Sequence, residues 1–156
     1  MGSISHKNII IQSGGQTGAD RAALDWAIEN EVQYRGWCPR GRLAEDGLIP
    51  QYYELLETKS SDYAIRTQMN VRDSDGTAIL SIDPYLNGGS RLTEHLANKS
   101  NQPVLHIHSG MKQPGQQLQN FVQVNEIKIL NMAGPRASRE PEVYKFVKSV
   151  LQAAFT

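Results

Sequence analysis

The alternation of short apolar runs with segments of helical periodicity constrains this chain more than any other feature. Residues 9–11 form a β-branched run, and 77–82, 104–108 and 127–130 are further short runs that favour strands. Between them, apolar residues recur three and four positions apart, as on one face of an amphipathic helix. Strands and helices that alternate in this way form βαβ units and a parallel sheet. The sequence therefore predicts an α/β fold, with a mainly parallel sheet and helices on both faces.

The spacing of apolar residues also places the helices and the main loop. Helices are predicted over about 18–31, 63–72, 90–98, from 118 onward and over 143–154. A weak strand signal covers 34–38, and the Gly- and Pro-punctuated segment 39–50 predicts a long loop. In sheets of this kind ligands bind beyond the carboxyl ends of the strands, so we expect the functional site there.

Size and composition narrow the class of protein. A chain of 156 residues predicts one domain, residues 1–156. Its one cysteine, Cys38, excludes an intrachain disulfide and favours a reducing compartment. The 16 basic and 16 acidic residues cancel, so we expect no nucleic-acid partner. No apolar run reaches the length of a membrane span, and the first residues lack the pattern of a secretory signal, so we expect a cytoplasmic protein without a membrane partner.

The turn after the first strand is the strongest candidate site. The segment Ser13-Gly14-Gly15-Gln16-Thr17-Gly18-Ala19-Asp20 is rich in small residues that let a ligand approach the backbone. A helix follows it, and the free N–H groups and dipole of a helix start suit phosphate. The segment lacks the Lys of a P-loop and a ribose-reading acidic residue about 20 positions on, which disfavours a nicotinamide site. A structural alternative fits as well, in which Thr17 caps the helix and Asp20 completes a capping box.

A second loop of the same kind follows a later strand. Asn87-Gly88-Gly89-Ser90-Arg91-Leu92-Thr93-Glu94 again opens a helix, so two loops of one sheet could hold an anion between them. The alternative is a turn in which Ser90 is the N-cap.

Further polar residues are weaker candidates. Arg42 lies in the long loop, and Arg136 lies between the last strand and the last helix, from where it could reach an anion. His106 and His108 share a face of one strand, but two histidines without a third ligand favour a structural pair over a metal site. We expect Cys38 to be a buried, inert thiol. No protein-ligated metal is expected.

Taken together, these residues resemble the family of putative molybdenum carrier proteins. The matching segments run over nearly the whole chain: Gly14-Gly15-Gln16-Thr17-Gly18-Ala19-Asp20, Ala23-Leu24-Asp25, 36–47, Ile49-Pro50, Tyr52, Arg66-Thr67, Asn70-Val71, Ser74-Asp75, Thr77, Gly88-Gly89-Ser90, Thr93 and Ala133-Gly134-Pro135-Arg136. The resemblance implies a Rossmann-like three-layer fold, of the group that includes DNA-processing-protein A and the lonely-guy phosphoribohydrolases. It also implies molybdenum cofactor, a phosphorylated pterin that carries the metal on its own dithiolene, as the bound ligand.

The comparison with the phosphoribohydrolases is informative about catalysis. Arg66 and the double glycine Gly88-Gly89 resemble that group's arrangement. Those enzymes continue with a further Gly-Thr pair and a catalytic Glu, whereas this chain has His95 at that place and Glu94 one residue early. One residue rotates a side chain by about 100° around a helix, which disfavours hydrolysis.

The sequence thus predicts a non-catalytic binding or carrier protein for a phosphorylated pterin or nucleotide-like ligand. The alternatives are a phosphoribohydrolase-like enzyme that cleaves N-glycosidic bonds with Glu94 or Asp75, and a nucleotide-sensing module. We also expect a homo-oligomer, a dimer or a tetramer, because of the family resemblance and the aromatic residues near Tyr52 and Tyr63. The predicted ligand-binding residues are Gly14, Gly15, Gln16, Thr17, Gly18, Asp20, Arg42, Arg66, Asn70, Gly88, Gly89, Ser90, Thr93 and Arg136.

Overall fold

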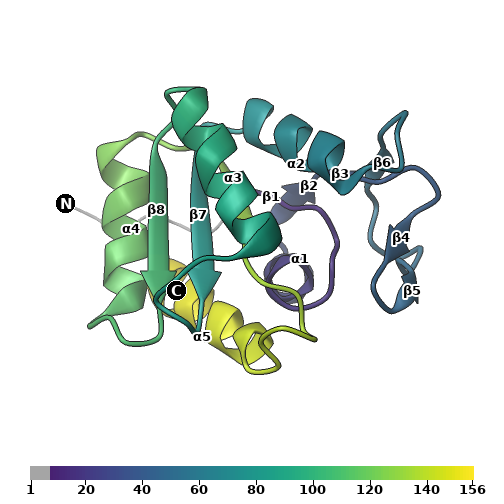
Figure 1. The fold of residues 1–156 in the computed structure, drawn as a ribbon. Coiled ribbons are helices and arrows are strands. Elements are labelled where there is room, and N and C mark those ends of the chain that lie inside the picture. Colours follow the sequence, from purple (N-terminus) through teal and green to yellow (C-terminus); the bar gives the residue numbers. More distant parts are fainter. Residues whose placement is uncertain (1–7) are drawn as a thin grey trace.

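A five-stranded sheet forms the centre of the protein in the computed structural model, which describes residues 8–156 (Figure 1). Its strands are β1 (Ile10–Gln12), β2 (Gln33–Arg35), β7 (Gly76–Ser81), β8 (Val104–His108) and β9 (Ile129–Ala133). Their order is β2-β1-β9-β7-β8, and every neighbouring pair is parallel. The predicted parallel sheet is therefore confirmed. The prediction that the first residues do not form a secretory signal concerns residues that lie outside the described part of the chain.

Helices cover both faces of this sheet, as predicted. The helices α1 (Ala19–Glu29), α4 (Pro114–Val124) and α5 (Val143–Phe155) pack together on one face, and α2 (Tyr63–Arg72) and α3 (Gly88–Lys99) cover the other (Figure 1). The main core lies under the first group, where Trp26 of α1 meets Phe155 of α5 with ring centroids 5.9 Å apart. Within residues 8–156, none of the helices is both long and apolar enough to cross a membrane.

The last strand begins two residues later than the apolar run predicts. Ile127 is buried in the core but lies outside the strand. The carboxylate of Asp75 accepts the backbone N–H groups of Lys128 and Ile129, at 3.1 and 2.8 Å, and so fixes where the strand starts. Strand β9 then continues through the polar residue Asn131, which the apolar pattern did not include.

Residues 36–62 form an additional layer beside the sheet rather than one long loop. Strand β3 (Trp37–Cys38) pairs with β6 (Leu56–Glu57), and β4 (Leu43–Ala44) pairs with β5 (Gly47–Leu48). The weak strand signal over 34–38 is divided in the structure between β2 and β3. The other short strands were not predicted, because a two-residue strand has no periodicity to detect.

A second, smaller core and one buried arginine hold this layer together. Its buried apolar residues are Leu24, Cys38, Ala44, Ile49 and Tyr53. The Arg42 guanidinium donates to the carbonyl oxygens of Pro50 and Tyr53, both at 2.8 Å. Arg42 therefore organises the 42–53 backbone.

Among the glycines of residues 8–156, Gly36 has the least room for a side chain. A Cβ there would lie 1.7 Å from the backbone oxygen of Ser13, the residue that follows β1. Gly36→Ala is expected to lower the free energy of unfolding by about 1–3 kcal/mol, because the backbone of two neighbouring segments must separate. Gly89→Ala is the matched control, since a Cβ there meets nothing within 4 Å. Urea unfolding of both variants tests this, and equal stability of Gly36→Ala and the parent would contradict it.

Candidate functional site

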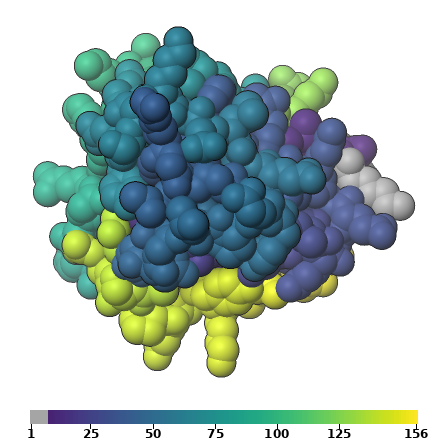
Figure 2. Space-filling model, turned by 90° about the vertical axis from the view of Figure 1, so that its right-hand side faces the viewer, coloured from purple at the N-terminus to yellow at the C-terminus, as the bar shows by residue number. Residues whose placement is uncertain are grey.

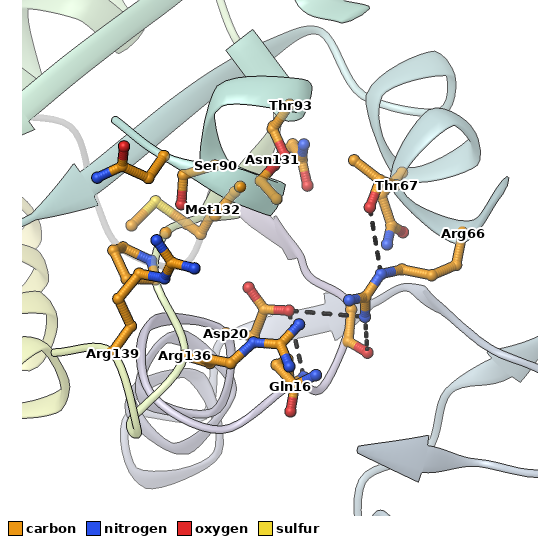
Figure 3. A pocket seen from close by; sticks show the side chains of 18 of the residues that line it. Gln16, Asp20, Arg66, Thr67, Ser90, Thr93, Asn131, Met132, Arg136 and Arg139 are labelled. Atoms are coloured by element: carbon orange, nitrogen blue, oxygen red, sulfur yellow. Dashed lines mark hydrogen bonds and ion pairs between the residues drawn. The ribbon is translucent and has the colours of Figure 1, made fainter. Parts of the chain in front are cut away.

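A polar cavity of about 700 Å³ opens beyond the carboxyl ends of β1, β7 and β9, which is the edge predicted to bind ligands. Four segments far apart in the sequence form its walls: the β1–α1 loop, helix α2, the start of α3, and β9 with the loop that follows it (Figure 3). Its volume is within the usual range for a small-molecule site.

The first turn of α1 presents the Asp20 carboxylate to the cavity, and N–H groups around it are bonded within the protein. The N–H of Gln16 donates to Asp20 Oδ2 at 3.2 Å, and the N–H of Ala19 donates to the carbonyl of Pro135 at 3.1 Å. The expected cap at Thr17 is wrong, because the N-cap is Gly18, for which the described residues supply no side-chain cap bond. The start of α1 is thus largely satisfied from within the protein.

Gln16 has one fully used end and one free end. Its Oε1 accepts the N–H groups of Thr17 and Glu45, at 3.1 and 2.9 Å, which fixes the orientation of the amide. Its Nε2 is buried and has no hydrogen-bond partner among residues 8–156. A buried donor without a partner is costly, so this amide group is ready for a ligand acceptor.

The start of α3 carries a second buried group without a partner. Ser90 is 4% exposed, and its Oγ makes no hydrogen bond within the described part of the chain. The N-cap of α3 is Asn87, not Ser90 as the structural alternative expected, because the helix begins two residues earlier. The first turn of α3 therefore offers a hydroxyl and the positive end of the helix dipole to the cavity.

Three arginines give the cavity a positive charge. Arg66 of α2, and Arg136 and Arg139 after β9, line it. Arg66 Nη1 donates to the carbonyl of Gly14 at 2.9 Å. The guanidinium groups of Arg66 and Arg136 lie 5.4 and 5.8 Å from the centroid of the Tyr63 ring, so one aromatic side chain holds both at the rim.

Asp20 is the one carboxylate that the described residues contribute to the lining. Burial raises its pKa, although Arg66 Nη1, 3.8 Å from Oδ2, and the N–H of Gln16 act in the opposite direction.

Ten of the predicted ligand residues line the same cavity: Gly14, Gln16, Asp20, Arg66, Asn70, Gly88, Gly89, Ser90, Thr93 and Arg136.

Four other predicted ligand residues lie outside the lining and support it instead. A Cβ on Gly15 would meet Leu55 at 2.8 Å, and one on Gly18 would meet the Pro135 carbonyl at 2.5 Å. Thr17 Oγ1 donates to Glu45 and accepts the N–H of Ala137. Arg42, as described above, binds carbonyl groups of its own loop.

The residues considered for hydrolysis are also outside the lining. Asp75 lies at the opposite end of the sheet, where it binds the start of β9. Glu94, on α3, is close enough to His106 to raise the pKa of that histidine, although burial lowers it overall. The ring of His106 is 2.6 Å from Ser81 Oγ and 5.8 Å from the ring of His108.

Sequence reasoning missed Asn131, Met132 and Arg139, which also line the cavity. The sequence does contain a signal for Asn131, which is a polar residue directly after an apolar run. In the structure its side chain is buried, with 3% exposure. The predicted strand ended at residue 130, three residues before the observed end at Ala133, so Asn131 was left outside it.

A parallel sheet with helices on both faces and a polar cavity at its carboxyl edge defines a Rossmann-like α/β protein. The chain belongs to the circularly permutated YpsA SLOG family, whose profile matches residues 11–155. The crystal structure of a putative molybdenum carrier protein from Syntrophus aciditrophicus SB matches it with a TM-score of 0.93 and 45% sequence identity, over 96% of this chain and 97% of that chain. The resemblance drawn from the sequence is thus confirmed. No curated protein sequence matches this chain.

Asp20→Asn is expected to stabilise the protein at neutral pH, by about 1 kcal/mol. It removes a buried charge, while the amide oxygen can still accept the Gln16 N–H. Because the pKa of Asp20 is higher in the folded than in the unfolded chain, the parent loses stability as the pH rises through that interval. The gain should therefore be small at acid pH and full above the raised pKa. Urea unfolding over a pH series measures this difference in the free energy of unfolding. A variant less stable than the parent at neutral pH would contradict the prediction that the buried Asp20 charge is destabilising.

Proposed function

We propose that this protein binds a phosphorylated pterin or nucleotide-like ligand in the cavity and acts as its carrier, without turning it over. The observation that carries this proposal is Ser90 Oγ, a buried group without a partner among the described residues, in the first turn of α3. Arg136 and Arg139 line the same cavity. Free donors at a helix start beside guanidinium groups are the usual environment of a bound phosphate.

The position proposed for the phosphate is the α3 side of the cavity. The α1 side has most of its N–H groups bonded within the protein and carries the Asp20 carboxylate, which repels an anion. Gly88 and Gly89 leave the backbone at the α3 start accessible, since a Cβ on Gly89 would meet nothing within 4 Å. The two glycine-rich loops would then face the ligand from opposite sides, with the anion against the second.

Molybdenum cofactor is the ligand that we propose first. The support is the name of the similar crystal structure, a putative molybdenum carrier protein, together with the chemistry of the cavity. Arginine, serine and amide donors suit the phosphate and the ring of a phosphorylated pterin. In this ligand the dithiolene sulfurs hold the metal, so the chain's own residues would bind the organic part.

The N-glycosidic hydrolase is not favoured by the placement of its candidate residues. Such an enzyme needs a carboxyl group within about 3 Å of the reacting atom or its water. Glu94 and Asp75 both lie outside the lining of the cavity.

Arg136→Ala is expected to weaken the binding of pyrophosphate, used as a probe, by roughly tenfold, because it removes a charge-assisted hydrogen bond. Arg91→Ala is the matched control: Arg91 is an exposed arginine of α3 that lies outside the lining. Isothermal titration calorimetry of the parent and both variants measures the effect. An equal loss in both variants would indicate general electrostatics and would contradict the proposed site.

The absence of turnover is tested in the same preparation. The parent is incubated with nucleoside monophosphates for hours and the free base is followed by chromatography. We expect no enzyme-dependent release. Release that Glu94→Gln abolishes would replace the carrier proposal with the hydrolase.

We further propose that the protein is a homo-oligomer in the cytoplasm, assembled through the 36–62 layer. Figure 2 looks onto this layer, drawn in blue above the yellow C-terminal part. Leu43 and Leu48 face each other across the β4–β5 pair at 51% and 69% exposure, and Tyr52 and Leu56 are exposed by 65% and 63%. The neighbouring pair Leu43 and Leu48 supports the proposal, because exposed apolar side chains that adjoin one another, rather than lie singly, mark interaction sites.

Light scattering is expected to give at least twice the mass of one chain. Leu48→Glu should shift the protein toward the monomer, because it places a charge among these apolar side chains. A single-chain mass for the parent at working concentration would contradict the proposal.

A further inference from the structure

Two buried polar groups without partners lie in different walls of the cavity. Ser90 Oγ belongs to α3 and Gln16 Nε2 to the β1–α1 loop, and neither makes a hydrogen bond among residues 8–156. Their side chains are buried, since the two residues are 4% and 6% exposed. In Figure 3 Ser90 and Gln16 lie on opposite sides of the cavity, with Asp20 between them. A folded protein rarely leaves such groups without a partner, so each indicates a place for a ligand group.

The free end of the Gln16 amide can only donate. Its Oε1 accepts the N–H groups of Thr17 and Glu45, so the oxygen is fixed on the side of the amide that faces these two residues. Thr17 and Glu45 lie outside the lining of the cavity, whereas Gln16 is part of it. The end left for the cavity is therefore Nε2, and the NH2 group of an amide is a donor and not an acceptor.

The sheet sets the separation of the two groups. Gln16 follows β1 and Ser90 follows β7, and β9 lies between these two strands. Neighbouring strands are about 4.8 Å apart, so the segments that leave β1 and β7 begin roughly 10 Å from each other. An inorganic anion is too small to reach both groups at once. A phosphate ester that carries a ring is long enough to do so.

Asp20 decides the charge of the ligand group that fits at Gln16. Its carboxylate lies in the first turn of α1, and Oδ2 accepts the backbone N–H of Gln16 at 3.2 Å. A second anionic group beside the Gln16 amide would lie close to this carboxylate and be repelled by it. A ring nitrogen or a carbonyl oxygen accepts a proton of Nε2 without adding a charge. The ligand that satisfies both walls thus has one anionic end and one neutral acceptor.

We infer that Gln16 is a specificity-determining residue, which donates a hydrogen bond to a neutral acceptor atom on the ring of the ligand while the phosphate lies at Ser90. This inference rests on the proposed function and specifies its ligand class: a phosphate ester of a nitrogen heterocycle whose acceptor atom lies roughly 10 Å from the phosphate. A ring with carbon at that place binds less tightly, because it leaves the Nε2 donor buried without a partner.

Two nucleotides of the same shape test the acceptor on the ring. Purine riboside 5′-monophosphate has two nitrogen acceptors in its six-membered ring, and benzimidazole riboside 5′-monophosphate has carbon at both places. Neither base has a hydrogen-bond donor. We expect the parent to bind the purine nucleotide roughly tenfold more tightly in isothermal titration calorimetry. Ribose 5-phosphate, which has no base, measures the phosphate end alone.

Two substitutions of Gln16 assign this preference to its NH2 group. Gln16→Glu keeps an oxygen that can accept the N–H groups of Thr17 and Glu45 and replaces the NH2 group by a second oxygen. Gln16→Met removes the amide and keeps the length of the side chain. Both variants should lose the preference for the purine nucleotide. The matched control is Gln123→Glu, which makes the same change at an exposed position of α4 outside the lining and should keep the preference of the parent.

The outcomes separate this inference from the proposed function. Equal binding of the two nucleotides by the parent would overturn the inference, and binding of ribose 5-phosphate in the same series would leave the proposed phosphate site intact. A preference that both Gln16 variants retain would assign the selectivity to other residues and would also overturn the inference. Binding of none of the three probes, and of no pyrophosphate, would overturn the inference and the proposed function together.

Discussion

The close approach of helix α1 to the loop after β9 is the contact on which the cavity depends. Gly18 has a φ of +83°, and a Cβ there would lie 2.5 Å from the Pro135 carbonyl, which instead accepts the N–H of Ala19. Gly134 is equally confined, with the Leu80 carbonyl 2.2 Å from its would-be Cβ. Two glycines therefore bring the ends of β1, β7 and β9 together. This junction places Asp20 and Arg136 in one cavity, although they are far apart in the sequence.

The 36–62 layer also contacts the β1–α1 loop and the loop after β9, so this surface layer helps to hold the site in place. Glu45 accepts hydrogen bonds from Thr17 Oγ1 and from the N–H and hydroxyl of Ser138, on the two loops that flank the cavity. These bonds hold the pKa of Glu45 below its ordinary value. Asp46 forms a bidentate pair with Arg21 of α1, at 2.6 and 2.9 Å. The layer thus fixes the loops that carry the ligand-facing groups.

The sequence predicted the sheet, the helices and most of the lining, because these follow from periodicity and from glycine-rich turns after strands. It failed where a residue's role depends on the contacts that its side chain makes in the folded chain. Arg42 was predicted to bind the ligand because it is charged, but its guanidinium donates hydrogen bonds to carbonyl groups of its own loop. Thr17 was assigned to the cap or the ligand, but Glu45, far along the chain, is its partner. Asn131 was missed because a strand boundary decided whether it was seen as part of the sheet.

Local chemistry also decides which of the two glycine-rich loops can take an anion, although their sequences look alike. Each opens a helix, and each has two adjacent glycines. In the first, Asp20 and the Pro135 carbonyl occupy N–H groups that a phosphate would need. In the second, Ser90 Oγ has no partner within residues 8–156, and the arginines after β9 line the cavity that it faces. A chain with a formal net charge of zero can thus hold a locally positive site, because three arginines and one carboxylate share the cavity lining. The Asp20 carboxylate repels an anion from the α1 side of the cavity, so the start of α3 is the more favourable side for an anion.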